Sequence, residues 1–424
     1  MFKSWLKFFI KIRVVHSVRR FFLFLFSVPV NKNNWEDRFL IINLQALGDL
    51  VLFTGVLKNY KITFPNKKIY LAIKKGVGFE SFLKPSFVDE IIAVDYKKFS
   101  INPIYGFSAI SKLRRIGFRK VVNQDFSAAE ISGKIIATSL GAEDVIGSDG
   151  LELEFKFPFD IQQEKNLKFF GRNILPLYTK IIRSKNIKSA PKENRFPSAI
   201  SYYAKIFESI APQSKDYSPT LPIPNNSTDI IRKFNLANQK YAVLNINASV
   251  AYKRWPVERF MEIARLLLNR NIAPVLIGTN KEYPSADNFV SKVTGSINLA
   301  GQTSLEELVI IIANSEVVLS NDTSTVHFAV ALKKPSLCIT GGGQFGIQHN
   351  YGYSDINLWV YTMTSCYVDN FRCGKRVPPG EPSPCINAVS VDIVKKKIIT
   401  LLDYINNLEK EKKNCPAEPF RIVF

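Results

Sequence analysis

The sequence predicts an α/β protein made of two units, each a parallel sheet covered by helices. Apolar runs typical of strands alternate with stretches typical of helices in two separate series along the chain. A segment with several prolines lies between the series, and 424 residues are more than one ordinary hydrophobic core accommodates. We therefore expect domains at residues 37–218 and 241–405, joined by a linker at residues 219–240.

The first series contains four apolar runs rich in β-branched and aromatic residues, as strands are. We expect these strands at Phe39–Leu44, Lys68–Ile73, Glu90–Val94 and Lys120–Asn123. Helices are expected at Gly48–Tyr60, Pro103–Arg115 and Ala128–Leu140. Residues 151–215 show no such alternation, and we interpret them as loops or helices that elaborate the end of the first domain.

The second series has the same alternation and predicts a second parallel sheet. Its strands are expected at Tyr241–Asn245, Pro274–Ile277, Val317–Leu319 and Ser336–Ile339. Its helices are expected at Val257–Arg270, Ala286–Val293, Ser304–Ala313 and Thr325–Leu332. Pro256 is placed to open the first of these helices, because proline fits the first helical turn.

Residues 1–34 are basic and apolar and contain no acidic residue. Lys3, Lys7 and Lys11 fall on one helical stripe with aromatic and aliphatic residues around it, which is typical of a helix lying in a lipid interface. The apolar stretch Phe21–Val30 is shorter than the roughly 20 residues that a membrane span needs. We therefore expect a leader at residues 1–36, with residues 1–34 as a peripheral membrane anchor, and a tail at residues 406–424. The alternatives for the leader are a cleaved signal peptide and a helix packed on the protein itself.

The formal net charge of +21 indicates an anionic partner: nucleic acid, an acidic membrane surface or a phosphorylated substrate. We disfavour nucleic acid, because the sequence has no zinc-finger spacing, RNP-like aromatic motif or basic leucine zipper. Five cysteines are an odd number in a chain long enough to fold without disulfides, which favours a reducing compartment. Cys366, Cys373 and Cys385 cluster without a tight Cys-x-x-Cys, so free or loosely paired thiols are favoured over a metal site.

The segment after the expected strand Val317–Leu319 has the polar composition of a phosphate-binding turn. Asn321, Asp322, Thr323 and Ser324 come just before the expected helix Thr325–Leu332. The first N–H groups of a helix have no partner within the helix and can bind an anion. We expect Asp322 to cap the helix, and Thr323 and Ser324 to offer hydroxyl and N–H groups outward. The alternative is an ordinary helix start without a ligand.

Two further turns carry charged residues after a strand. Gly48 and Asp49 follow the first strand of the chain, where Asp49 is either a general base facing a ligand or the N-cap of the next helix. Lys253 follows the strand Tyr241–Asn245, and its flexible ammonium group suits a diphosphate. Ser249, in the same turn, would add a hydroxyl group. No Asp-x-Asp pair is present, so the metal clamp used by many sugar-nucleotide transferases is not expected.

These three turns, in this order, resemble glycosyltransferase family 9, the heptosyltransferase family. The family pattern reads Gly-Asp-[Val/Leu] early, Lys-x-Trp-Pro midway and Asp-Thr-Gly-x-x-His late, and the resemblance extends from Phe39 to Lys397. It implies the GT-B fold, with two Rossmann-like αβα domains facing a central cleft. It also implies an inverting, metal-independent transfer of a sugar, with ADP-heptose as the leading donor, to a lipopolysaccharide-core or related anionic glycolipid. Such an enzyme would work at the cytoplasmic face of the inner membrane.

The resemblance also assigns roles to single residues. Asp49 and Lys253 are the expected catalytic residues, as base and phosphate ligand. The expected donor-binding set is Gly48, Ser249, Lys253, Glu282, Asp322, Thr323, Ser324 and His327. Within it Glu282 would accept from ribose hydroxyls, and His327 would pack or hydrogen-bond within the helix behind the phosphate turn. Ser324 departs from the family, which usually has Gly there.

Three rival functions follow from the same residues. The first is a transferase of the same fold that uses another sugar nucleotide, and the second is one that acts on a protein acceptor. The third is a catalytically silent protein that binds nucleotide or anionic lipid. Asp49 and Lys253 together argue against the third, because a binding module needs no base.

Overall fold

The computed structural model describes ten segments of the chain. These segments are residues 28–84, 86–125, 131–148, 168–169, 172–173, 179–182, 198–212, 216–341, 356–362 and 377–414. The chain divides into two compact units, Met1–Ser218 and Pro219–Phe424. Most of the predicted membrane leader and the last ten residues of the predicted tail lie outside the described segments. No helix in the segments described is long and apolar enough to cross a membrane.

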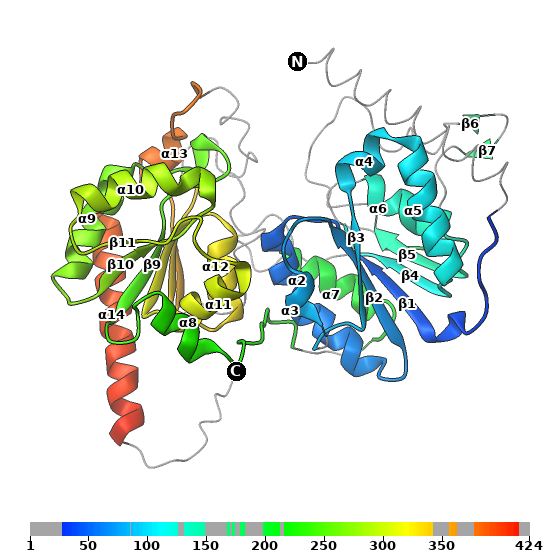
Figure 1. Ribbon diagram of the computed structural model, residues 1–424, viewed down its shortest axis with the longest axis horizontal. Helices are drawn as coiled ribbons and strands as arrows, with labels where there is room; N and C mark the ends of the chain where they lie inside the picture. The colour runs from blue at the N-terminus through cyan, green and yellow to red at the C-terminus, as the bar shows by residue number, and fades with distance from the viewer. Residues whose placement is uncertain are drawn as a thin grey trace. The chain divides into compact units, whose positions relative to one another are not determined.

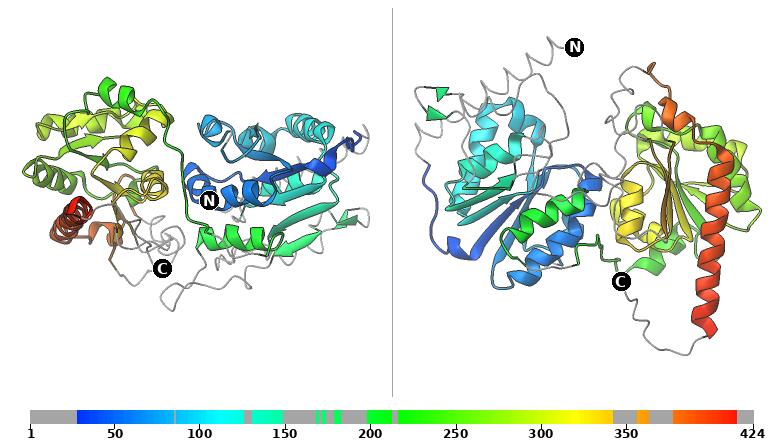
Figure 2. Two further views of the ribbon diagram at one scale, coloured as in Figure 1. Left: turned by 90° about the horizontal axis from the view of Figure 1, so that it is seen from below. Right: turned by 180° about the vertical axis from the view of Figure 1, so that it is seen from behind.

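The N-terminal unit is built on a sheet of six parallel strands in the order β3-β2-β1-β4-β5-β8. These strands are β1 (Arg38–Ile42), β2 (Lys68–Lys74), β3 (Glu90–Val94), β4 (Lys120–Asn123), β5 (Asp144–Ser148) and β8 (Lys180–Ile182). The central strand β1 is apolar along almost its whole length because helices cover both faces of the sheet, as Figures 1 and 2 show. A separate antiparallel pair joins β6 (Lys168–Phe169) to β7 (Arg172–Asn173).

Helices cover the N-terminal sheet in two layers. One layer contains α4 (Tyr96–Ile101), α5 (Pro103–Ile116) and α6 (Ile131–Ser139). The other contains α2 (Leu47–Thr63) and α7 (Ala199–Glu208), which pack on each other. Phe53 of α2 lies 4.9 Å from Tyr203 of α7, and Tyr60 lies 4.8 Å from Phe207, between ring centroids. The helix α2 has buried residues on nearly every side, because it lies between the sheet and α7. The short elements η1 (Trp35–Asp37) and α3 (Glu80–Leu83) complete the unit.

The C-terminal unit repeats this architecture with the strand order β11-β10-β9-β12-β13-β14, all parallel. The strands are β9 (Tyr241–Asn245), β10 (Ala273–Leu276), β11 (Ile297–Asn298), β12 (Val317–Asn321), β13 (Ser336–Ile339) and β14 (Asn357–Val360). One face packs on α9 (Val257–Leu268), α10 (Tyr283–Lys292) and α14 (Val391–Asn414). The other faces α11 (Leu305–Ala313) and α12 (Ser324–Ala331), as seen in Figure 1. The short helices are α8 (Ser227–Lys233), η4 (Ala251–Lys253), η5 (Asn280–Glu282) and α13 (Pro384–Asn387).

The structure has the predicted α/β class, with two Rossmann-like units. The predicted interdomain linker, residues 219–240, contains α8, which packs on α11. Lys233 of α8 forms an ion pair of 2.5 Å with Glu307, so this segment is part of the C-terminal unit. The predicted tail begins inside α14, which runs on past residue 405 to Asn414.

Candidate functional site

Each sheet has one point where the strand order reverses, and the predicted site residues follow the strands there. In the N-terminal unit β1 has β2 on one side and β4 on the other, and in the C-terminal unit β9 lies between β10 and β12. The loops after two such strands lead in opposite directions and leave a crevice at their carboxyl ends, where open α/β sheets bind ligands. Asp49 follows β1, whereas Lys253 and Asp322 follow β9 and β12.

Lys253 and Asp322 form an ion pair at the carboxyl edge of the C-terminal sheet. The Lys253 Nζ atom lies 3.0 Å from Asp322 Oδ2, and their side chains are 17% and 2% exposed. Burial alone would lower the pKa of Lys253, but the charge of Asp322 and its hydrogen bond outweigh this, so the pKa is raised. A raised pKa keeps the Lys253 ammonium group protonated at every pH below the ordinary lysine value, and this charge is lost only as the pH rises through the raised value. Lys253 therefore carries its charge at neutral pH.

Asn321, the last residue of β12, holds the turn that presents Lys253. Its Oδ1 accepts from the Trp255 backbone N–H at 2.9 Å, and its Nδ2 donates to the Ile246 carbonyl at 2.9 Å. The side chain is fully buried, and Trp255 donates from its ring nitrogen to the Val389 carbonyl at 2.9 Å. The turn from Ile246 to Trp255 is thus fastened at both ends, which fixes the backbone that carries Lys253.

The start of α12 differs from the prediction by one residue. Its N-cap is Thr323, whose side chain accepts from the Thr325 N–H at 3.4 Å, whereas Asp322 was expected to be the cap. The Asp322 carboxylate is directed to Lys253 instead, because a buried ammonium group needs an opposite charge more than a helix end does. Asn245 donates to the hydroxyls of Thr323 and Thr325 at 3.3 and 2.8 Å, which ties the end of β9 to the same turn. Thr323 and Ser324 are partly exposed, so their hydroxyl groups can reach a ligand.

The other residues of the predicted donor set are distributed around this turn. Ser249 is exposed in the loop after β9, and His327 is buried on α12, as expected for a packing residue. Glu282 lies past the end of β10, and its Oε2 accepts from the Thr279 N–H at 2.6 Å in a capping box. The capping role explains the position of the Glu282 side chain without a ligand. A carboxylate in this role still has lone pairs that can accept from the donor groups of a ligand.

Asp49 lies in the first turn of α2, in the N-terminal unit. The N-cap of α2 is Ala46, without a side-chain cap, so the interpretation of Asp49 as a mere N-cap is wrong. Gly48 precedes it in the same helical turn, and Asp49 is 8% exposed. The hydroxyl of Tyr203 lies 3.5 Å from the Asp49 carbonyl. Burial and the negative charge of Asp49 raise the pKa of that hydroxyl, so Tyr203 stays protonated beside the carboxylate.

Asp125, just past the end of β4, was missed in the sequence. Its Oδ1 accepts from the Leu44 N–H at 2.7 Å and from the Gln45 side chain at 3.4 Å, in the loop between β1 and α2. The charge of Asp125 also raises the pKa of Tyr203, after burial and Asp49. The polar run Asn123-Gln124-Asp125 after a predicted strand was the available signal. Its importance depends on β1 and β4 being neighbours, which no local pattern reveals.

Metal ligands do not gather in the part of the chain that the structure describes. No group of three His, Cys, Asp or Glu side chains there could hold a metal ion. Cys366 and Cys373 of the cysteine cluster lie outside these residues. Cys385 is buried, and its Sγ lies 3.3 Å from the Ser383 hydroxyl.

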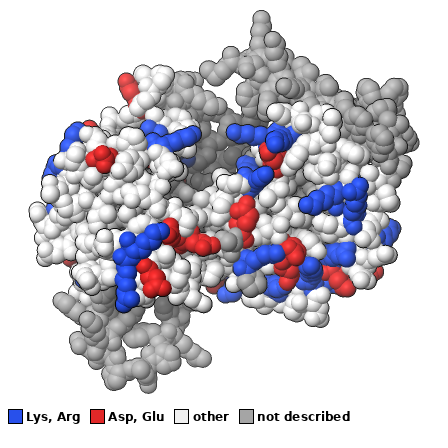
Figure 3. Space-filling model, in the orientation of Figure 1, with Lys and Arg blue, Asp and Glu red and all other residues white. Residues whose placement is uncertain are grey.

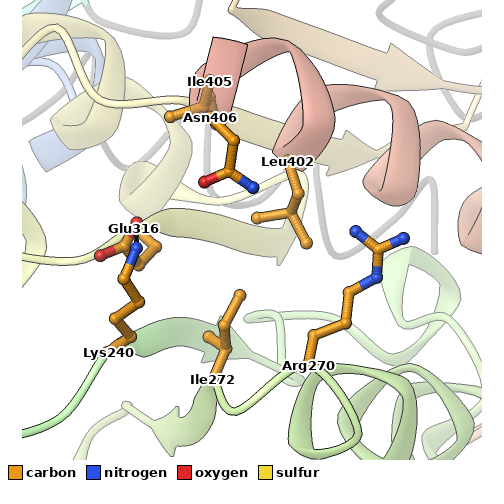
Figure 4. A pocket seen from close by; sticks show the side chains of 7 residues that line it. All are labelled: Lys240, Arg270, Ile272, Glu316, Leu402, Ile405 and Asn406. Carbon is orange, nitrogen blue, oxygen red and sulfur yellow. Dashed lines mark ion pairs between the residues drawn. The ribbon is translucent and has the colours of Figure 1, made fainter. Parts of the chain in front are cut away.

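A separate pocket lies at the opposite ends of the strands in the C-terminal unit, as Figure 4 shows. Lys240, Ile272 and Glu316 directly precede β9, β10 and β12 and line this pocket. Lys240 pairs with Glu316 at 3.6 Å, and Arg270 pairs with Asp403 at 2.7 Å. Because these cations are already matched by carboxylates, the pocket does not select an anion.

Two doubly wound units, with charged ligand groups where the strand order reverses, define a protein of the GT-B class. A family model for glycosyltransferase family 9 (heptosyltransferase) matches residues 182–368. Over that segment the chain is similar to glycosyltransferase family 9.

Three individual proteins illustrate the relationship. Lipooligosaccharide heptosyltransferase 2 of Haemophilus influenzae is 24% identical over 197 residues, which are 39% of this chain and 56% of that protein. The structure of Escherichia coli ADP-heptose lipopolysaccharide heptosyltransferase II matches with a TM-score of 0.60 at 16% identity, over 88% of this chain and 99% of that one. The iron-containing dodecameric heptosyltransferase TibC has a TM-score of 0.51 at 10% identity, over 88% of this chain and 78% of that one. The alignments of this chain with four curated heptosyltransferases span only 25% to 56% of the length of those proteins.

We predict that Asn321→Ala lowers the free energy of unfolding by about 2 to 4 kcal/mol, because it leaves the Trp255 N–H and the Ile246 carbonyl without their partner. Chemical denaturation measures this. The exposed Asn314, which bonds to Ser227 and Ile310, is the matched control, and Asn314→Ala should cost less than about 1 kcal/mol. Equal costs for the two variants would show that Asn321 does not fasten the turn.

Proposed function

We propose that this protein is an inverting glycosyltransferase that moves a sugar from a nucleotide donor to a glycolipid. The donor we infer is ADP-heptose, and the acceptor is a lipopolysaccharide-core or related lipid. The single observation that carries the proposal is the Lys253–Asp322 pair beside the start of α12, at the reversal point of the C-terminal sheet. Packing of a hydrophobic core does not require a lysine paired with an aspartate at this edge of the sheet.

The donor diphosphate would bind to the Lys253 ammonium group, to the hydroxyls of Thr323 and Ser324, and to the N–H groups at the start of α12. Asp322 neutralises part of the lysine charge and holds it in one orientation. Glu282 would accept from the ribose hydroxyls of the nucleotide. As the bond between the anomeric carbon and the phosphate oxygen breaks, negative charge grows on the leaving diphosphate, and these donors stabilise it.

Asp49 would act as the general base in the N-terminal unit. It would take the proton of the acceptor hydroxyl as the hydroxyl oxygen bonds to the anomeric carbon, while the nucleoside diphosphate departs from the opposite face. One displacement of this kind inverts the anomeric configuration. The Tyr203 hydroxyl next to Asp49 stays protonated and cannot compete as a base at neutral pH.

The family and its heptosyltransferase relatives support the choice of heptose and of a lipopolysaccharide acceptor. A transferase with another sugar nucleotide or a protein acceptor, and a silent binding protein, are the alternatives. A panel of sugar nucleotides, assayed for release of nucleoside diphosphate, separates them. We place the reaction at the cytoplasmic face of the inner membrane, with residues 1–34 as a peripheral anchor, because sugar nucleotides are made in the cytoplasm.

We predict that Asp49→Asn lowers kcat about 10² to 10⁴-fold, because the amide keeps the size of the side chain but cannot accept a proton. The affinity for the nucleotide should stay within about twofold, since Lys253 and the α12 turn are untouched. Steady-state kinetics and calorimetry measure the two quantities. The exposed Asp37→Asn is the control and should leave both unchanged. A loss of nucleotide affinity with normal turnover would make Asp49 a structural residue.

The Lys253 assignment requires a double variant, because Asp322 is buried and would lose the opposite charge of Lys253. We predict that Lys253→Met with Asp322→Asn weakens binding of ADP about 10 to 100-fold, as expected for lost hydrogen bonds to a charged group. Binding of adenosine should change little, because it has no phosphate. The exposed Lys292→Met serves as the control, with no effect on either ligand. Equal weakening of both ligands would contradict phosphate binding by Lys253.

We propose that the transfer needs no metal, because the lysine, hydroxyl groups and helix N–H groups can together balance the charge of the diphosphate. Dialysis against EDTA should therefore leave kcat unchanged to within about twofold. Metal analysis of the dialysed protein checks that removal was complete. Loss of activity that only iron or zinc restores would refute this and direct attention to Cys366, Cys373 and Cys385.

A further inference from the structure

Two isoleucines are exposed at the corner between α4 and α5. Ile101, the last residue of α4, is 47% exposed, and Ile104 in the first turn of α5 is 70% exposed. Among the large apolar side chains in the described segments, Ile104 has the highest exposure. Exposed apolar groups of this size side by side indicate a binding surface more often than a single one does.

The corner is well held, so this exposure does not come from loose packing. Phe99 and Ser100 of α4 are buried, and the Ser100 hydroxyl lies 3.3 Å from that of Ser132 on α6. Asn102 caps α5 by accepting from the Tyr105 N–H at 3.0 Å. The Tyr105 hydroxyl in turn accepts from the Asp95 N–H at 3.0 Å. The fold thus fixes both isoleucines outward.

Four lysines lie on α4 or next to its start. Lys97 and Lys98 are exposed on α4, in the turn before Ile101. Lys74 at the end of β2 holds its Nζ 4.8 Å from the ring centre of Tyr96, and the Lys75 N–H donates to the Val94 carbonyl at 2.8 Å. Asp95 is the N-cap of α4 and accepts from the Lys98 N–H at 3.0 Å. Its Oδ2 also lies 3.9 Å from the Lys98 Nζ, an exposed ion pair that contributes little and that salt screens.

We propose that these six residues form a membrane contact, which we call the corner patch. Its members are Lys74, Lys75, Lys97, Lys98, Ile101 and Ile104. Exposed isoleucines and lysines on neighbouring segments match the two layers of an anionic bilayer, since apolar groups enter the acyl boundary and lysines stay among the phosphates. A protein interface would need a larger apolar centre than two side chains. Figure 3 shows Lys and Arg in several groups, many beside acidic residues, so net charge alone does not identify this face.

The corner patch serves the proposed reaction by its place in the sheet, and this part of the argument depends on the proposed function. α4, which carries Lys97, Lys98 and Ile101, follows β3, and the turn with Asp49 follows β1, so both leave the same edge of one sheet. The strands β3 and β1 are separated by β2 alone, which puts them about 10 Å apart. A glycolipid held in the bilayer would therefore meet the protein at the edge of the sheet that carries Asp49. This contact is additional to the expected anchoring by residues 1–34.

Vesicle binding by the full chain tests the patch. Lys97→Gln with Lys98→Gln should weaken binding to vesicles of 70% phosphatidylcholine and 30% phosphatidylglycerol about tenfold to thirtyfold, at low salt. Ile101→Ser with Ile104→Ser should weaken it about tenfold, with less dependence on salt. The matched controls are Ile62→Ser, which removes an isoleucine 58% exposed on α2, and Lys281→Gln with Lys292→Gln in the C-terminal unit. Equal effects of patch and control variants would overturn the proposal.

A strong anchor elsewhere in the chain could hide these differences, so hydrogen exchange provides the second measurement. On the unaltered protein, peptides covering residues 96–106 should exchange more slowly when the anionic vesicles are added, whereas peptides around Ile62 should not change. Pure phosphatidylcholine should protect residues 96–106 much less. Vesicle-bound protein with unchanged exchange at residues 96–106 would refute the corner patch. So would protection that is already complete without vesicles, since another part of the protein would then cover the corner. Neither result bears on the Asp49 and Lys253 assays with soluble substrates, so the two proposals fail separately.

Discussion

The parallel direction of all strands within each main sheet is the constraint on which the rest of this structure depends. Helices cover both faces of such a sheet, so polar groups can gather only at its ends. At one end of the C-terminal strands lie Lys253 and Asp322, and at the other lies a pocket whose charges are already paired. The reversal of strand order leaves a crevice at the first of these ends, which is where open α/β sheets bind ligands.

The charge balance at the C-terminal site has a chemical consequence. Lys253 and Asp322 together are close to neutral, so the lysine cannot be the sole counterion of a diphosphate. In the proposed reaction the remaining stabilisation would come from neutral donors, namely the hydroxyls of Thr323 and Ser324 and the N–H groups at the start of α12. Asn245 fixes the position of the Thr323 hydroxyl. Such preorganised dipoles cost no reorganisation as charge develops on the leaving group.

Most of the fold could be predicted because strands buried on both faces appear as continuous apolar runs. Four of the eight predicted strands have the observed bounds, and the other four agree with them within two residues. The strands β5, β8, β11 and β14 were not predicted. Asp49 and Lys253 could be proposed as site residues because each lies in the turn after such a run. Asn321 and Asp125 were not assigned their roles, because their partners lie 66 and 81 residues away and become neighbours only through strand order. For the same reason the sequence placed the cap at Asp322, since it could not show that Lys253 would compete for that carboxylate.

The packing of α2 has a consequence for synthesis of the chain. This helix is apolar on nearly every side, and α7, which covers it, is encoded about 140 residues later. At about 5 to 20 residues per second, a ribosome needs roughly 7 to 30 seconds to make that interval. Throughout that time α2 lacks the helix that covers its apolar surface in the folded unit, and Phe53 and Tyr60 lack their aromatic partners on α7. Folding of this unit is therefore completed late, and holdase chaperones have a defined window in which to bind it.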